Sequence, residues 1–249
     1  MTIEISEEAG VRSLHFGSDW VQGAMRVARP YALELDYTRE MMAALLLRPE
    51  PAWPRRVLLV GLGAGSLTKF LHRHRPAAKL VVVEIDPAVV GAAYQYFRLP
   101  DDPARIRIEI GDGADYVARS RAKFDLILVD GFDADARAGR LDTLPFYLDC
   151  RARLSGEGLL VVNLLSRRRS FRQSVERIEE AFEGRALAFP SCDSGNAVAF
   201  AAAGEAVKTT LAELKDLAQA LKKDTGLNLL PTVARVEQAR SCAGGLLEL

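Results

Sequence analysis

The chain has 249 residues, of which 49% are hydrophobic and 27% charged, an ordinary composition for a globular protein. Lysine plus arginine equals aspartate plus glutamate at 33 each, so the net charge gives no reason to expect a nucleic-acid or anionic-membrane partner. Three widely spaced cysteines lack the close pairs of a zinc site and favour a reducing, cytoplasmic location. Because the first residues contain neither a signal peptide nor a membrane-spanning run, we expect a soluble protein.

Residues 1–54 are expected to form an N-terminal appendage. Alternating apolar stretches at 11–17 and 20–25 predict a small antiparallel β-sheet with a turn at 17–19. Apolar residues at helical spacing predict a helix over 37–47, which the proline-rich segment 49–54 ends.

Residues 55–204 alternate strands with helices, the pattern of an α/β domain with a mostly parallel sheet covered by helices on both faces. Two apolar stretches at 186–189 and 197–202, joined by turn residues, predict a closing antiparallel hairpin. Residues 205–249 are expected to form a helical extension. The apolar stripe of its helix is Leu211, Leu214, Ala218 and Leu221.

Four predicted strands end in Gly61, Glu84, Asp112 and Asp130. In an open parallel sheet, ligands bind outside the carboxyl ends of the strands, so these residues should line one crevice. The pattern predicts a nucleoside site.

A glycine-rich turn, Gly61, Gly63 and Gly65, would let the backbone turn from strand to helix and approach a ligand closely. Glu84 follows at about 20 residues, the distance at which an acidic side chain accepts both ribose hydroxyls. A nicotinamide-dependent oxidoreductase would use the same features. It would, however, need a glycine where Ser66 stands.

Asp112, followed by Gly113, is placed to accept a hydrogen bond from an exocyclic amine such as that of adenine. An aspartate after a strand is more often a helix cap, here for a helix over 114–119. Its combination with Glu84 favours the nucleoside interpretation, and a dehydrogenase has no evident use for Asp112 together with Asp130.

Together these segments resemble the spermidine synthase family, the polyamine aminopropyltransferases, within the S-adenosylmethionine-dependent methyltransferase superfamily. The resemblance is carried by the following motifs: 61–66 (GLGAGS), 83–86 (VEID), 111–113 (GDG), 129–133 (VDGFD), 21–25 (VQGAM) and 35–42 (LDYTREMM). It implies a Rossmann-like class I methyltransferase fold. It also implies transfer of an aminopropyl group to a small-molecule amine, with decarboxylated S-adenosylmethionine or S-adenosylmethionine as co-substrate, no metal, and a possible homodimer.

The resemblance also implies roles for single residues. Glu84 would hold the ribose and Asp112 the adenine amine. Asp130 would orient or deprotonate the attacking amine, and Asp133 would help to bind the positive charge of the substrate, although a polar loop residue explains Asp133 equally well. The remaining candidates for substrate binding are Gln22, Tyr37 and Arg39.

Two departures from the family pattern leave other functions open. Ala64 stands where the family has an aspartate that binds the ammonium of decarboxylated S-adenosylmethionine, and Thr38 and Arg39 replace its Tyr and following His or Gln. An alanine at position 64 also leaves room for the carboxylate of intact S-adenosylmethionine, which an aspartate would repel. The alternatives are a methyltransferase and a non-catalytic nucleoside-binding protein.

Overall fold

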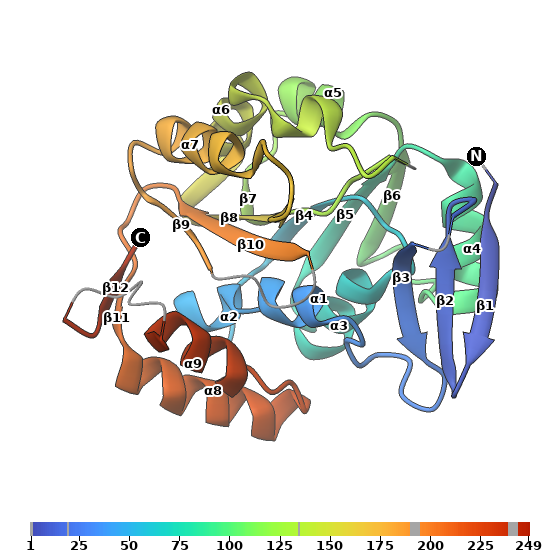
Figure 1. The fold of residues 1–249 in the computed structure, drawn as a ribbon, viewed down its shortest axis with the longest axis horizontal. Helices are drawn as coiled ribbons and strands as arrows, with labels where there is room; N and C mark the ends of the chain where they lie inside the picture. Colours follow the sequence, from blue (N-terminus) through green and yellow to red (C-terminus); the bar gives the residue numbers. More distant parts are fainter. Residues whose placement is uncertain (1, 19, 134, 190–194, 239–243) are drawn as a thin grey trace.

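A computed structural model of the chain describes residues 2–18, 20–133, 135–189, 195–238 and 244–249. Its centre is a seven-stranded sheet in the order β6-β5-β4-β7-β8-β10-β9 (Figure 1). The strands are β4 (Arg56–Val60), β5 (Lys79–Glu84), β6 (Ile106–Ile110), β7 (Phe124–Val129), β8 (Leu154–Leu165), β9 (Ala186–Ala188) and β10 (Asn196–Ala202). The predicted α/β fold with a mostly parallel sheet is confirmed.

The strand pairings explain where a ligand site can lie. β4, β5, β6, β7 and β8 pair in parallel, and β10 is antiparallel to both β8 and β9. The chain leaves β4 to one side towards β5 and later returns to the other side with β7, so the strand order reverses beside β4. Such a switch point is where open α/β sheets bind their ligands. The predicted hairpin is the β9–β10 pair, and residues 190–194 of its turn lie outside the described residues.

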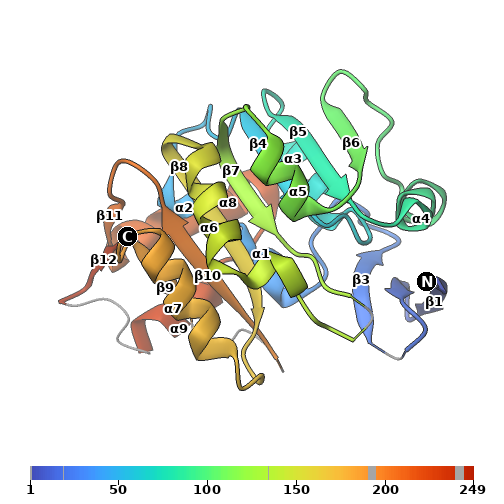
Figure 2. The ribbon, with the colours of Figure 1, turned by 90° about the horizontal axis from the view of Figure 1, so that it is seen from above.

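Helices cover both faces of the sheet (Figures 1 and 2). They are α3 (Ser66–His74), α4 (Pro87–Phe97), α5 (Gly113–Arg119), α6 (Leu144–Arg153) and α7 (Phe171–Ala181). A first hydrophobic cluster lies under α5, α6 and α7 and includes the buried thiol of Cys150. A second cluster on the opposite face unites α3 and α4 with the N- and C-terminal segments. Cys192 and Cys242 lie outside the described residues.

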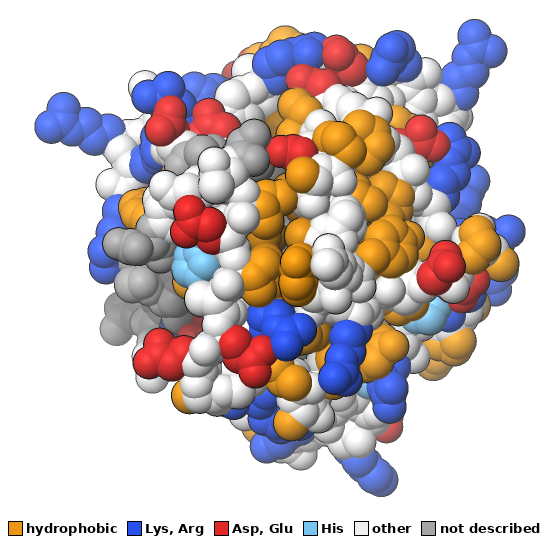
Figure 3. All heavy atoms as spheres, turned by 90° about the vertical axis from the view of Figure 1, so that its right-hand side faces the viewer, with side chains coloured by type: hydrophobic (Ala, Val, Ile, Leu, Met, Phe, Trp, Pro, Cys, Tyr) orange, Lys and Arg blue, Asp and Glu red, His pale blue; other side chains and the backbone are white. Residues whose placement is uncertain are grey.

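The N-terminal sheet has three antiparallel strands, β1 (Glu4–Glu8), β2 (Val11–His15) and β3 (Val21–Arg26). The predicted sheet is confirmed, with β1 as an additional strand, and Asp19 of the predicted turn lies outside the described residues. The N-terminal sheet, the residue before β3 and α4 carry exposed large hydrophobic side chains, which are Trp20, Val21, Tyr94 and Tyr96. Figure 3 shows hydrophobic side chains gathered on this side of the molecule.

The single helix predicted over 37–47 is wrong. The segment forms two short helices, α1 (Asp36–Met41) and α2 (Ala44–Leu47), separated by a turn at Met42 and Ala43. Around this break, backbone bonds of the tighter i→i+3 type, such as Met42 N–H to the Arg39 carbonyl, replace the α-helical ladder. The apolar residues on both sides are buried, so hydrophobic spacing alone could not reveal the break.

The C-terminal extension contains β11 (Lys208–Thr210), α8 (Leu211–Thr225), α9 (Leu230–Gln238) and β12 (Leu246–Glu248). Leu214, Ala218 and Leu221 of the predicted apolar stripe are buried, and the N-terminus of α8 is capped by Thr210 and Glu213 in a reciprocal capping box. No helix in the described part of the chain has the length and apolar character needed to cross a membrane.

Candidate functional site

The glycine turn links β4 to α3 and brings the backbone close to β7. Gly61 has φ +97°, and a Cβ on it would stand 2.1 Å from the carbonyl oxygen of Asp130. Any side chain at position 61 would therefore separate the ends of β4 and β7. Gly63 and Gly65 also have positive φ values, and Gly65 precedes α3 in the left-handed conformation.

Glu84 fastens the end of β5 to the glycine turn. Its Oε2 accepts a hydrogen bond from the Leu62 backbone N–H at 2.9 Å, and its Oε1 accepts from the Asp86 N–H at 3.0 Å. Burial raises the pKa of this carboxyl, while the backbone donors oppose the shift. Glu84 is only 7% exposed yet faces the cavity, so a ligand that reaches it meets a carboxylate already fixed in direction. Asp86 caps α4 by accepting from Ala88 N–H.

Asp112 caps helix α5. Its Oδ1 accepts from the N–H groups of Ala114 at 2.7 Å and Asp115 at 3.1 Å, so the capping role that the sequence left open is present. Its second oxygen, Oδ2, accepts from Arg140 at 3.3 Å, and Arg140 also pairs with Asp115 at 2.8 Å. Asp112 and Gly113 both line the cavity, so capping leaves Asp112 within reach of a ligand there.

Asp130, which follows β7, is held between two side chains from other elements. Its Oδ2 accepts from the Tyr37 hydroxyl of α1 at 3.1 Å, and its Oδ1 accepts from Asn163 Nδ2 of β8 at 2.9 Å. Burial raises the pKa of Asp130, and both hydrogen bonds oppose that shift. A carboxyl with a raised pKa and a fixed orientation at a cavity wall is the type of group that accepts a proton in catalysis.

A cavity of about 890 Å³ brings most of the predicted residues together. The predicted residues on its wall are Gln22, Tyr37, Gly61, Gly63, Glu84, Asp112, Gly113, Asp130 and Asp133. Gly65 shapes the turn without lining the cavity. In the parts of the chain that the structure describes, no three His, Cys, Asp or Glu side chains are placed to hold a metal ion together.

The structure does not bring Arg39 to this cavity. Its guanidinium donates to the carbonyl oxygens of Leu33 and Glu34 and pairs with Asp36 at 2.6 Å. Residues two positions apart on a helix point roughly 200° apart around its axis. Because Tyr37 points to Asp130, Arg39 faces the loop before α1 instead.

Asp133 lies on an exposed loop that borders the cavity. Its Oδ1 accepts from the N–H groups of Asp135 at 2.9 Å and Arg137 at 2.8 Å. One oxygen thus fixes the loop that runs to the short 3₁₀ helix Gly139–Asp142. The sequence left open whether Asp133 binds the positive charge of the substrate or is a polar loop residue. Its place in a loop at the border of the cavity is compatible with both.

Asn163 was not among the predicted site residues. It is 5% exposed, it lines the cavity, and its Oδ1 is buried without a hydrogen-bond partner among the described residues. A buried unpaired acceptor is costly unless a ligand supplies a donor. Its place at the carboxyl end of a strand was the available signal. Three arginines of the cavity wall, Arg140, Arg167 and Arg168, were also not predicted to line it.

With the glycine turn, the three strand-end carboxylates and the Tyr37 contact in place, comparison with known proteins decides the family. The spermine/spermidine synthase domain matches residues 35–187. A polyamine aminopropyltransferase from Chromobacterium violaceum is 36% identical over 245 residues, covering 98% of this chain and 93% of the relative. The chain belongs to the spermine/spermidine synthase family.

Solved structures agree with the fold of this family. A probable spermidine synthase from Corynebacterium glutamicum superimposes with a TM-score of 0.73, covering 88% of this chain and 83% of that chain at 21% identity. Human methyltransferase-like protein 13, crystallised in complex with SAH, has a TM-score of 0.68 at 26% identity, covering 78% and 93% of the two chains. The spermine/spermidine synthase domain thus shares its class I methyltransferase fold with a structure that binds an S-adenosyl nucleoside.

Proposed function

We propose that this protein transfers the aminopropyl group of decarboxylated S-adenosylmethionine to a small amine. The observation that carries the proposal is Asp130, fixed by Tyr37 and Asn163 at the wall of a cavity that also contains the glycine turn and Glu84. Two comparisons support the proposal: the chain belongs to the spermine/spermidine synthase family, and it is 36% identical to a polyamine aminopropyltransferase.

The reaction joins two parts of the cavity. Glu84 receives the ribose hydroxyls and Asp112 the adenine amine, so the sulfonium carbon is directed towards Asp130. The acceptor amine is a protonated cation near neutral pH, because alkyl ammonium pKa values are about 10. Asp130 accepts one of its protons, the nitrogen attacks the carbon, and the carbon–sulfur bond breaks. The sulfur keeps the electron pair and leaves as a neutral thioether nucleoside.

The amine is held by acceptor groups. The unpaired Oδ1 of Asn163 and the side chain of Gln22 can each receive an N–H, and Asp133 supplies negative charge at the cavity border. Positioning contributes much of the rate, because a sulfonium is already a good leaving group.

Ala64 is where this chain departs from the family, and the residue is 2% exposed and absent from the cavity wall. A ligand's ammonium would therefore be received by cavity residues other than position 64. Of these, Asp130 and Gln22 lie next to the turn, where their backbone carbonyls face Gly61 and Gly63. The choice between decarboxylated and intact S-adenosylmethionine then depends on the charge of these residues. Carboxylates favour the decarboxylated ligand.

Calorimetric titration of the purified protein with both ligands tests this choice. We expect tighter binding of decarboxylated S-adenosylmethionine, by about tenfold or more, and a smaller preference for it in Asp130→Asn, which lacks the carboxylate. Tighter binding of the intact ligand would contradict the proposal.

Methyl transfer is the second candidate, favoured by the likeness to human methyltransferase-like protein 13 in complex with SAH and by Ala64 in place of an acidic residue. It predicts that intact S-adenosylmethionine binds more tightly and yields a methylated amine. The same titration therefore separates the two functions.

A further inference from the structure

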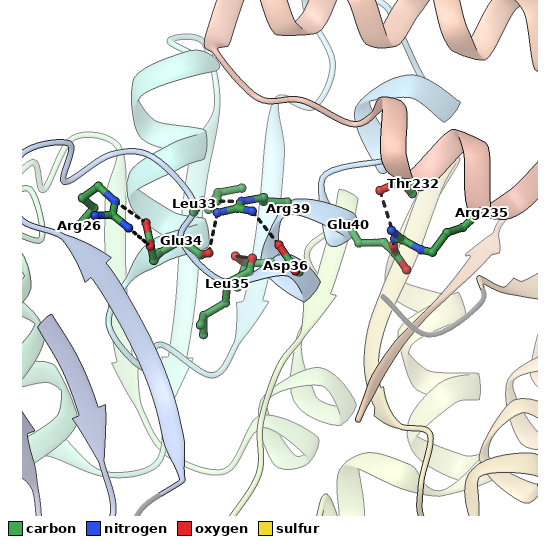
Figure 4. A network of polar contacts seen from close by, with 10 residues as sticks. Arg26, Leu33, Glu34, Leu35, Asp36, Arg39, Glu40, Thr232 and Arg235 are labelled. Atoms are coloured by element: carbon green, nitrogen blue, oxygen red, sulfur yellow. Dashed lines mark hydrogen bonds and ion pairs between the residues drawn. The ribbon is translucent and has the colours of Figure 1, made fainter. Parts of the chain in front are cut away.

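A polar contact joins two helices that are far apart in the sequence. Arg235 of α9 donates through Nη2 to Oε2 of Glu40 on α1, a separation of 195 residues, and to the Thr232 hydroxyl at 3.4 Å (Figure 4). The Glu40 side chain is 1% exposed and that of Arg235 29%. A buried carboxylate without a cation would be costly, so this pair ties the C-terminal extension to α1.

Helix α1 needs such contacts to hold its position. It has six residues, and Leu35 before it provides no side-chain cap. Isolated helices of this length are not stable in water, so tertiary contacts must place it. The beginning of α1 is fixed by Arg39, which binds the carbonyls of Leu33 and Glu34, and by the ion pair of Arg26 with Glu34 (Figure 4).

The end of α1 is fixed by a different route. The helix packs on β8 and β10, and Glu40 extends from its last turn to Arg235. Glu40 and Tyr37 are three residues apart, which places them as neighbours along the helix surface. Tyr37 in turn donates to Asp130 at 3.1 Å. One short helix therefore connects α9 to the carboxylate of the proposed site.

We propose that Arg235, through Glu40, is a positioning residue that holds Tyr37 on Asp130. The proposal rests on the function proposed above, since it assigns to the C-terminal extension a part in the same reaction. Neither Arg235 nor Glu40 lines the cavity, so both act through Tyr37 and touch no substrate.

Two consequences distinguish this role from simple stabilisation of the fold. When α1 shifts, Asp130 loses the Tyr37 hydrogen bond, one of two that lower its pKa, and the acid limb of the rate profile moves to higher pH. The nucleoside contacts of Glu84 and Asp112 are on other elements, so the KM for the nucleoside changes little.

The test compares Arg235→Met with Lys215→Ala. The control breaks an exposed ion pair between α8 and α9, that of Lys215 with Glu237 at 2.9 Å. We expect Arg235→Met to lower kcat about tenfold with KM for the nucleoside within about twofold, and to move the acid limb in the same direction as Tyr37→Phe. Lys215→Ala should leave kcat and its pH profile unchanged.

A double variant tests whether Arg235 acts through Tyr37. If Arg235 acts through Tyr37, then Arg235→Met adds little to the loss already caused by Tyr37→Phe. Multiplicative losses, or an unchanged kcat and acid limb in Arg235→Met, would overturn the proposal. Glu40→Gln keeps the shape of the side chain and removes its charge, and it provides the same comparison if Arg235→Met folds poorly.

A readout without turnover separates this inference from the proposed function. Carboxyl ¹³C NMR titration, with the Asp130 signal assigned by its loss in Asp130→Asn, follows the pKa of Asp130 directly. We expect Arg235→Met and Tyr37→Phe to raise it alike, whether or not the wild type transfers an aminopropyl group. A rise in Tyr37→Phe without one in Arg235→Met would refute the role of Arg235.

Discussion

Gly23 of the N-terminal sheet lies directly against Ala64 of the glycine turn. A Cβ on Gly23 would stand 2.7 Å from Ala64 Cβ and 2.8 Å from Ala64 N, closer than real Cβ atoms approach. Strand β3 thus seals the outer side of the turn, and the Gln22 carbonyl lies 3.2 Å from where a Cβ on Gly63 would be. The N-terminal sheet is part of the wall that shapes the proposed nucleoside site.

Gly23→Ala is therefore expected to push β3 away from the turn. We predict destabilisation of about 1–3 kcal/mol in urea denaturation, because overpacking against backbone atoms cannot be relieved by a rotamer change. Nucleoside affinity measured by calorimetry should fall in parallel. Gly91→Ala, on α4 with no atom near its added Cβ, is the matched control and should be neutral or slightly stabilising. Equal stability and affinity in the two variants would show that the contact is not tight.

Glu84→Gln tests the carboxylate that joins β5 to the turn. An amide can accept from only one of Leu62 N–H and Asp86 N–H, and its NH₂ group then faces the other donor. We expect loss of about 1–3 kcal/mol of stability and at least about tenfold weaker nucleoside binding. Asp86→Asn, which preserves the cap of α4, should bind normally. Normal binding by the Glu84 variant would remove Glu84 from the ribose site.

Asp130→Asn should separate stability from activity. Burial raises the pKa of Asp130, so the native state binds its proton more tightly than the unfolded chain. The contribution of Asp130 to stability is then present below the unfolded pKa of about 3.9 and is lost as the pH rises through the folded pKa. At pH 7 the asparagine variant should be more stable in thermal melts, should keep nucleoside binding and should lose about 10²–10⁴ in kcat. An Asp130→Asn variant that is less stable than the wild type and fully active would contradict this prediction.

Lys69 on α3 makes stability depend on pH away from the site. Burial, followed by the charge of Arg98, lowers its pKa to about 7, and its Nζ donates to the Phe97 carbonyl at 2.7 Å. Between pH 7 and about 10.4 the unfolded chain binds the proton and the native state does not, so stability rises with pH across this window, by on the order of 5 kcal/mol.

Urea denaturation at several pH values from 6 to 10 measures this rise. Lys69→Met should flatten the pH dependence, whereas Lys79→Met, at the exposed start of β5, should leave it as in the wild type. The same slope in Lys69→Met as in the wild type would rule out Lys69 as its source.

The sequence predicted the residues that local rules position. Gly61, Glu84, Asp112 and Asp130 each lie at or just after the end of a β-strand of the parallel sheet, and the topology of such a sheet brings strand ends together whatever the intervening helices do. The sequence also indicated a local helix cap, since Asp112 caps α5 as one of its two interpretations proposed.

Other parts of the site depend on contacts that no local rule encodes. Tyr37 reaches Asp130 across 93 residues, and Asn163 reaches it across 33. The orientation of α1, which turns Tyr37 inwards and Arg39 outwards, follows from packing on β8 and β10 and from the break after Met41. Hydrophobic spacing continued through that break, so it favoured one helix and could not fix the rotation of the first.

The most direct test of the proposed function is to mix the purified protein with decarboxylated S-adenosylmethionine and a short aliphatic diamine, and to identify the products by mass spectrometry. We predict an aminopropylated amine and methylthioadenosine in equal amounts, with neither formed by Asp130→Asn. Formation of a methylated amine from intact S-adenosylmethionine, with no product from the decarboxylated ligand, would contradict aminopropyl transfer.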